Sequence, residues 1–356
     1  MKIISLVGAR PQFIKEAVIN WNFEKNGIDE ILVHSGQHYD VNMSAVFFQH
    51  LNIKKPDYHM NIGSGRHGEM TGKIMIEFEK IVIKEKPDMV LVYGDTNTTL
   101  AGALVAAKLK VPVVHVEAGE RQEPRDMPEE INRVLTDRVS NLLLCASHNA
   151  VRNLEKEGIK QGVHFVGDTM YDVYLKISEE FKVEEALNDF RLKESKYVLT
   201  TIHRDFNTDN PEKLKEIING LNKINKEYEV VFPMHPRTRK RLNEFRIDVD
   251  FKVLEPLDYL TLQSLVKGSR MVITDSGGLQ KEAFYGGKRA IVVMPDTGWI
   301  DLVKCGWNKL SNTDELYEKF IHMNEENIEM DSIGEPYGDG NSAKKIVEIL
   351  KKYSSY

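Results

Sequence analysis

Residues 271–283, with the sequence MVITDSGGLQKEA, show the structural unit that repeats along this chain of 356 residues. The first four residues form an apolar run typical of a buried strand, and the residues from Gly277 onward have a helical pattern. Ser276 and two glycines lie between them, so several backbone N–H groups are bare at the start of the predicted helix. Such a helix end is suited to binding phosphate, which makes Ser276, Gly277 and Gly278 candidate binding residues.

The same glycines have a purely structural interpretation, because a glycine-rich turn lets a helix pack closely on the preceding strand. This alternative stays open at the level of sequence. Glu282 lies one turn inside the predicted helix, where its carboxylate could accept hydrogen bonds from both hydroxyls of a ribose. The segment therefore predicts either a nucleotide site or a packing turn.

Apolar runs alternate with helical patterns along the whole chain, which predicts an α/β fold with parallel sheets. The runs of the first half are residues 3–7, 30–34, 89–93, 111–116, 142–145 and 164–166. A second series comprises residues 197–202, 230–233, 252–254, 271–274 and 290–294. Because these runs are continuous, we expect strands that are covered on both faces.

The length and the two series of strands predict two Rossmann-like domains. A charged helical stretch at residues 171–196 separates the series, so we expect one domain over residues 1–170 and the next from residue 171. Residues 342–353 form an amphipathic helix that must dock on one of them. Ligands of open parallel sheets bind beyond the carboxyl ends of the strands. The residues that directly follow each run are therefore the candidates for function.

The composition is that of an ordinary globular protein, with 41% hydrophobic and 29% charged residues. A formal net charge of −6 disfavours nucleic-acid or anionic membrane partners. Cys145 and Cys305 lie far apart and match no metal-ligand spacing, which favours a reducing cytoplasm and no metal site. We found no apolar run near the roughly 18 residues that span a membrane.

The first run ends in Gly8 and is followed by Arg10, Pro11 and Lys15. Proline can open a helix, and two cations near a helix start would suit an anion. Two solvated cations are the alternative interpretation. The segment is not a GxGxxG fingerprint, so no dinucleotide cofactor is expected.

Carboxylates follow the third and fourth runs, at Asp95 and Glu117. Asp95 could instead cap the next helix. Glu117 is harder to dismiss, since a buried carboxylate without a partner is costly. Glu129 and Glu130 open a further predicted helix, and at least one of them is expected to be only a partner of the helix dipole.

Histidine and arginine follow two strands of the second half, as His203-Arg204 and as His235 with Arg237. One such pair would be unremarkable. Two at equivalent strand ends suggest a site for a polyanion or for proton transfer.

Taken together, these segments resemble the non-hydrolysing UDP-N-acetylglucosamine 2-epimerase family, whose members have the two-domain GT-B fold. The matching segments, in chain order, are residues 8–15, 35–40, 94–98, 117–119, 128–133, 202–204, 235–237 and 274–282. The resemblance extends over nearly the whole chain, and several motifs in the right order are far more specific than any single one.

The resemblance implies a UDP site on the second domain, facing an inter-domain cleft. Residues 276–278 would contact the diphosphate and Glu282 the ribose. The remaining cationic or imidazole candidates for UDP binding are Arg10, Lys15, His235 and Arg237. The implied acid and base candidates are Asp95, Glu117, Glu129 and His203.

GT-B proteins often return their last helix to the first domain. The resemblance therefore assigns residues 342–356 to the domain of residues 1–170 and leaves residues 171–341 as the second domain. It also implies a cytoplasmic homodimer in polysaccharide biosynthesis that needs no cofactor. The implied reaction removes the C2 proton of the sugar as UDP leaves C1, and then re-adds UDP to the 2-acetamidoglucal with a proton on the other face.

Residues 296–303 differ from the Thr-Glu-Arg-Pro-Glu segment that is usual in members acting on UDP-N-acetylglucosamine. This departure favours UDP-2,3-diacetamido-2,3-dideoxyglucuronate as an alternative substrate. A GT-B glycosyltransferase and a hydrolysing 2-epimerase are the rival enzymes, and a nucleotide-sugar sensor is the non-enzymatic alternative.

Overall fold

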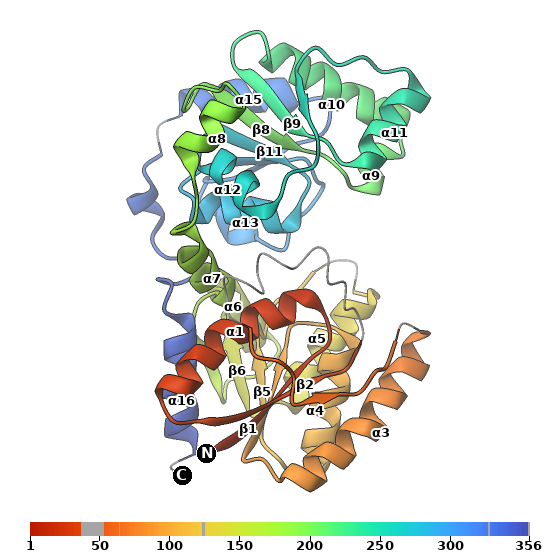
Figure 1. The fold of residues 1–356 in the computed structure, drawn as a ribbon, viewed down its shortest axis with the longest axis vertical. Helices are drawn as coiled ribbons and strands as arrows, with labels where there is room; N and C mark the ends of the chain where they lie inside the picture. The colour runs from red at the N-terminus through yellow and green to blue at the C-terminus, as the bar shows by residue number, and fades with distance from the viewer. Residues whose placement is uncertain (37–52, 64, 123–124, 327, 355–356) are drawn as a thin grey trace. The chain divides into compact units, whose positions relative to one another are not determined.

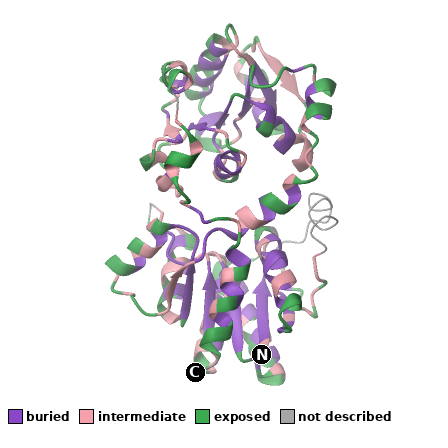
Figure 2. Cartoon of the chain, turned by 90° about the vertical axis from the view of Figure 1, so that its left-hand side faces the viewer, coloured by how far each residue is buried: buried purple, intermediate pink, exposed green. Residues whose placement is uncertain are grey.

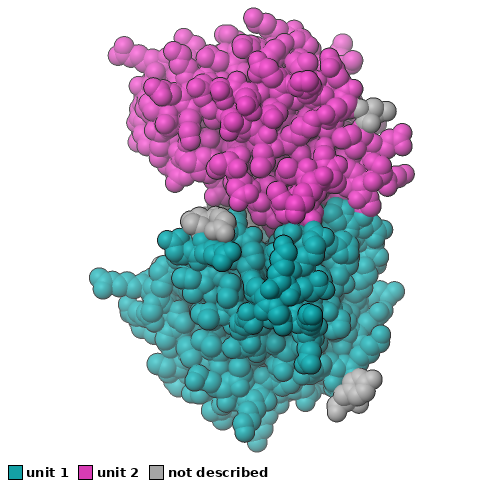
Figure 3. All heavy atoms as spheres, turned by 180° about the vertical axis from the view of Figure 1, so that it is seen from behind, with its two compact units in different colours: residues 1–177, 335–356 teal, residues 178–334 magenta. Residues whose placement is uncertain are grey.

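The computed structural model describes the chain except residues 37–52, 64, 123–124, 327 and 355–356, and except the side chain of Arg10. The chain divides into two compact units, coloured separately in Figure 3. Unit 1 comprises Met1–Ile177 and Glu335–Tyr356, and unit 2 comprises Ser178–Gly334. Among the described residues, no helix is both long and apolar enough to cross a membrane.

Unit 1 contains a parallel sheet in the order β3-β2-β1-β4-β5-β6-β7 (Figure 1). Its strands are β1 (Lys2–Val7), β2 (Asp29–His34), β3 (Tyr58–His59), β4 (Met89–Tyr93), β5 (Val113–Val116), β6 (Leu142–Cys145) and β7 (Val163–Phe165). Its helices are α1 (Arg10–Lys25), α3 (His67–Glu85), α4 (Asn97–Lys108), α5 (Pro128–Val139), α6 (His148–Lys156), α7 (Thr169–Ser178) and α16 (Ser342–Tyr353).

Unit 2 contains a second parallel sheet in the order β10-β9-β8-β11-β12-β13. Its strands are β8 (Tyr197–Thr201), β9 (Glu229–Pro233), β10 (Lys252–Leu254), β11 (Met271–Thr274), β12 (Ala290–Val292) and β13 (Lys309–Leu310). Its helices are α8 (Val183–Asp189), α9 (Asp205–Thr208), α10 (Pro211–Ile224), α11 (Pro236–Phe245), α12 (Tyr259–Gly268), α13 (Gly277–Tyr285), α14 (Ile300–Lys304), α15 (Leu316–Glu325) and a 3-10 turn at Met330–Ile333.

The central strands of both sheets are buried on both faces, as Figure 2 shows. Every residue of β4 and β11 is buried, which agrees with continuous apolar runs rather than alternating ones. The predicted α/β class with two Rossmann-like sheets is therefore confirmed. Each sheet also has a short edge strand that the sequence pattern did not indicate, β3 and β13.

The last helix, α16, packs against α1 in unit 1. The carboxylate of Asp172 accepts hydrogen bonds from the backbone N–H groups of Ser342 and Ala343, at 3.0 and 2.8 Å. At the other end, Lys351 donates to the Asn26 side chain at 2.7 Å. The unit boundary falls between Ile177 and Ser178, at the last residue of α7 and within the stretch 171–196 that separates the two strand series.

Candidate active site

The carboxyl ends of β4 and β5 bring two predicted carboxylates into adjacent turns. The two strands are parallel neighbours, and Tyr93 pairs with Val116 at their last shared position. Glu117 follows Val116 directly, and Asp95 follows Tyr93 after one intervening residue, Gly94. Glu117 has a φ of +69°, a backbone conformation that costs a non-glycine residue about 1–3 kcal/mol and is concentrated at functional sites.

Each of these carboxylates faces a cation. The ammonium of Lys15, on α1, forms an ion pair with Glu117, and the side chains are 12% and 18% exposed. Arg133, on α5, forms an ion pair with Asp95. The structure therefore brings Lys15 together with Glu117, which the sequence had assigned to different roles.

Asp95 is not the cap of helix α4. The N-cap is Thr96, whose side chain accepts a hydrogen bond from the Thr99 N–H at 3.3 Å. The backbone carbonyl of Asp95 accepts from the Asn132 side chain at 2.9 Å. The capping interpretation of Asp95 is wrong, and its carboxylate is directed to Arg133 instead.

Glu129 and Glu130, in the first turn of α5, have different surroundings. Glu130 is 3% exposed, and it accepts hydrogen bonds from Arg133 at 2.9 Å and from the Gln122 N–H at 3.1 Å. Glu129 is exposed. Glu130 therefore belongs to the ion-pair network around Asp95, while Glu129 leaves its carboxylate accessible.

A buried ion pair below these turns was not found by sequence reasoning. His115, in the middle of β5, contacts Asp137 of α5, and both side chains are fully buried. The signal was present in the sequence, because a histidine inside an apolar strand needs a polar partner.

In unit 2, the predicted phosphate cradle is the first turn of α13. Ser276 is the N-cap, and its hydroxyl accepts from the Leu279 N–H at 3.3 Å. A Cβ placed on Gly278 would meet no atom within 4 Å, and one on Gly277 only the end of Arg204 at 4.0 Å. Close packing therefore does not require these glycines, which weakens the packing-turn alternative.

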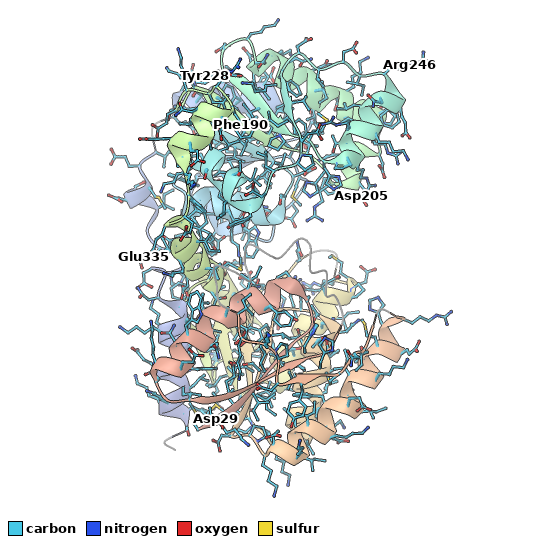
Figure 4. All side chains as sticks on the ribbon, viewed as in Figure 1. Asp29, Phe190, Asp205, Tyr228, Arg246 and Glu335 are labelled. Carbon is cyan, nitrogen blue, oxygen red and sulfur yellow. The ribbon has the colours of Figure 1, made fainter. Side chains whose placement is uncertain are left out.

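Asp275 is the organising residue of this end of the sheet, although sequence reasoning gave it no role. Its buried carboxylate accepts from the backbone N–H groups of His203 and Arg204, at 3.0 and 2.9 Å, and from the Asn207 side chain at 3.1 Å. It also faces Nδ1 of His203 at 3.2 Å. The turn after β8 is thereby fixed to the end of β11. Asp205, labelled in Figure 4, begins α9 just beyond this turn.

The two predicted histidines lie near each other, with ring centroids 6.0 Å apart. Burial lowers the pKa of His203; the charge of Asp275 opposes this shift, and the charges of Arg204 and His235 add to it. His235 is the N-cap of α11 and accepts from the Arg237 N–H at 3.1 Å. The guanidinium of Arg237 pairs with Asp209 at 2.5 Å.

Glu282 is partly buried inside α13. Burial raises the pKa of its carboxyl group, and hydrogen bonds from Tyr259 and Gln263 oppose the rise. The Gln263 amide donates to it at 2.7 Å. The carboxylate is thus oriented by neighbouring side chains.

The unusual segment 296–303 fastens the same helix end. The Trp299 indole N–H donates to the Gly277 carbonyl at 2.8 Å, and the Lys281 ammonium lies 3.6 Å from the centre of an indole ring face of Trp299. Thr297 donates to the Gln280 side chain at 2.8 Å. Of the other motif residues, 37–40 and the Arg10 side chain lie outside the described part of the chain.

Known proteins share this organisation. A family model described as UDP-N-acetylglucosamine 2-epimerase matches residues 22–351. A Pseudomonas aeruginosa protein named UDP-2,3-diacetamido-2,3-dideoxy-D-glucuronate 2-epimerase is 44% identical, and the match covers 99% of this chain and 100% of the relative. A Methanocaldococcus jannaschii UDP-N-acetylglucosamine 2-epimerase is 43% identical, with 100% of both chains covered.

A solved structure of the Methanocaldococcus jannaschii UDP-GlcNAc 2-epimerase, in complex with UDP-GlcNAc and UDP, has a TM-score of 0.81 and 42% identity. The match covers 99% of this chain and 100% of that one. These likenesses define an isomerase that acts on nucleotide sugars. The chain belongs to the UDP-N-acetylglucosamine 2-epimerase family, as the sequence motifs indicated.

Proposed function

We propose that this protein inverts C2 of a UDP-linked 2-acetamido sugar by elimination and re-addition of UDP. The substrate is UDP-N-acetylglucosamine or its 2,3-diacetamido glucuronate analogue, as the names of the two relatives suggest. The observation that carries the proposal is the pair of carboxylates, Asp95 and Glu117, in adjacent strand-end turns beside cations. Such an arrangement suits a reaction that needs one acid and one base.

The residue roles are those that the family resemblance implies, and the chemistry of each group supports them. Ser276, Gly277 and Gly278 would bind the diphosphate through the start of α13, and Glu282 would accept the ribose hydroxyls. Arg10, Lys15, His235 and Arg237 would add charge-assisted hydrogen bonds to the leaving UDP.

Proton transfer at C2 is assigned to four residues, Asp95, Glu117, Glu129 and His203. The ion pair with Lys15 holds the carboxylate of Glu117 at the end of β5, beside the other candidates of unit 1.

The reaction can be followed by proton NMR in deuterated water with each of the two UDP-sugars. We expect deuterium at C2 and a manno product, with UDP kept in the product. Free sugar and UDP would indicate a hydrolysing 2-epimerase. UDP release only with an added acceptor would indicate a glycosyltransferase, and binding without turnover would indicate a sensor.

We also propose a homodimer that forms through α3 and α5. Both helices contact α4, and each exposes an apolar stripe. Ile76 and Ile83 of α3 are each 58% exposed, and Ile131 and Leu135 of α5 are 47% and 45% exposed. Exposed stripes at helical spacing are typical of an association surface.

Sedimentation equilibrium would test the dimer. The protein should have twice its chain mass, and Ile83→Glu should shift it toward the monomer. A wild-type monomer would contradict the proposal.

Because UDP-sugars are the substrates of this reaction, we place the enzyme in the cytoplasm, where fractionation of the source cells should find it.

A further inference from the structure

The His115–Asp137 pair makes contacts that connect it to both strand-end turns of unit 1. Nδ1 of His115 faces Oδ1 of Asp137 at 2.7 Å, and Nε2 faces the carbonyl oxygen of Gly94 at 2.7 Å. A carbonyl oxygen can only accept, so Nε2 donates to it. Gly94 is the residue directly before Asp95, at the end of β4.

Asp137 binds the turn after β5, which contains Glu117. Its Oδ2 accepts from the Gly119 N–H at 3.2 Å, two residues after Glu117, and lies 2.8 Å from Nη1 of Arg121. Burial raises the pKa of Asp137, but the charges and hydrogen bonds of His115 and Arg121 outweigh burial and leave the pKa below its usual value. The carboxyl group of Asp137 is thus shared by His115, the Gly119 N–H and Arg121.

Asp137 also belongs to α5, the helix that carries Glu129 and Arg133. Arg133 in turn pairs with Asp95. One buried ion pair thus joins the three elements that present Asp95, Glu117 and Glu129. Both of its side chains are 0% exposed, so they act on the reacting groups only through these elements.

We propose that His115 and Asp137 are positioning residues that fix the acid and base candidates relative to one another. The inference rests on the proposed function and deepens it. Proton removal and delivery at C2 require the carboxyl groups at defined places on opposite faces of the sugar. A shift of about 1 Å in such groups can cost on the order of 10²-fold in rate.

The variants His115→Asn, Asp137→Asn and their combination test the proposal. At position 115 asparagine is too short to reach both Gly94 and Asp137. At position 137 asparagine has one acceptor oxygen where aspartate uses two, so each single change frees one turn. We expect kcat to fall about 10²-fold in each single variant, and the double variant to lose much less than the product of the two losses. The Kd for UDP, measured by calorimetry, should not change.

Glu30→Gln is the matched control. Glu30 is a buried carboxylate in the same sheet, bound by Ser5 and by Asn20 at 2.6 Å, but it lies near the amino end of β2. Its kcat should equal that of the wild type. A comparable loss of kcat in Glu30→Gln, or an unchanged kcat in the folded His115 and Asp137 variants, would overturn the proposal.

A second measurement does not depend on turnover. In protein labelled with 15N-histidine, both ring nitrogens of His115 should carry hydrogens, with signals that vanish in His115→Asn. A ring with one protonated nitrogen would overturn the ion pair. If the wild type instead shows both hydrogens but epimerises neither UDP-sugar, the proposed function fails while the pair itself stands.

Discussion

The two sheets present their candidate residues in different ways. At the carboxyl end of the unit 1 sheet, the candidate carboxylates form ion pairs with other side chains, Glu117 with Lys15 and Asp95 with Arg133. At the end of the unit 2 sheet, backbone groups dominate, since Asp275 accepts from main-chain N–H groups and α13 begins with two glycines. The first arrangement suits proton transfer, and the start of α13 in the second suits the binding of an anion.

The largest effect should come from Glu117→Gln in unit 1. The variant keeps the shape but cannot exchange a proton, so kcat should fall about 10³-fold while the Kd for UDP stays unchanged. Deuterium incorporation at C2 and calorimetry measure the two quantities. Glu326→Gln is the control, because it removes a carboxylate that binds Arg289 at 2.7 Å in unit 2. Loss of UDP binding with retained turnover would reverse the comparison between the units.

Glu129 and Glu130 allow a test between adjacent residues. Glu129→Gln should lower kcat about 10²-fold and leave the melting temperature unchanged, because its carboxylate is exposed. Glu130→Gln should instead lower the melting temperature, since the buried side chain accepts from Arg133 and Gln122. The kcat and the calorimetric melting temperature of the two variants distinguish the roles of the two residues. The opposite pattern would assign the chemistry to Glu130.

Asp275→Asn sharpens the description of unit 2. The side chain of asparagine has one acceptor oxygen where aspartate has two, so a buried N–H is left unsatisfied and the free energy of unfolding should fall by about 2 kcal/mol.

The same variant tests His203. Because the charge of Asp275 raises the pKa of His203, its removal should lower that pKa further. If neutral His203 acts as a base, the acid limb of the kcat profile then moves to lower pH. An acid limb that stays in place would exclude His203 from proton transfer.

The smallest effect should come from Trp299→Phe. Phenylalanine keeps an aromatic face over Lys281 but loses the N–H donor to Gly277, so UDP should bind about threefold more weakly. Trp307→Phe is the matched control, because its indole N–H donates to the Lys288 carbonyl at 2.9 Å elsewhere in unit 2. Equal effects of the two variants on UDP affinity would show that segment 296–303 does not support the cradle.

The strands were predictable because a strand buried on both faces needs a continuous apolar run. The edge strands β3 and β13 were missed, since two residues carry no periodicity. The ends of the apolar runs also identified Asp95 and Glu117. A residue that follows a run can be read from the sequence without knowing how the helices and strands pack together. The α/β class and the family motifs were visible in the sequence for the same reason.

The ion-pair and hydrogen-bond partners of the candidate side chains were much less predictable than the places of those side chains in the sheets. Lys15 and Glu117 are joined by the fold and not by sequence spacing, and His115 finds Asp137 only when α5 packs beside β5. The different surroundings of Glu129 and Glu130 depend on the direction of each side chain. Asp275 was passed over because a buried acceptor of main-chain N–H groups has no sequence signature.

The return of α16 to unit 1 has a consequence for synthesis of the protein. The face of α1 that α16 covers is completed by residues that are translated only after all of unit 2. Domains generally fold as units, the N-terminal one first. Here the N-terminal unit waits, with that face of α1 uncovered, while Ser178–Gly334 is translated. A premature stop codon shortly before residue 342 would therefore harm the first half of the enzyme more than the second.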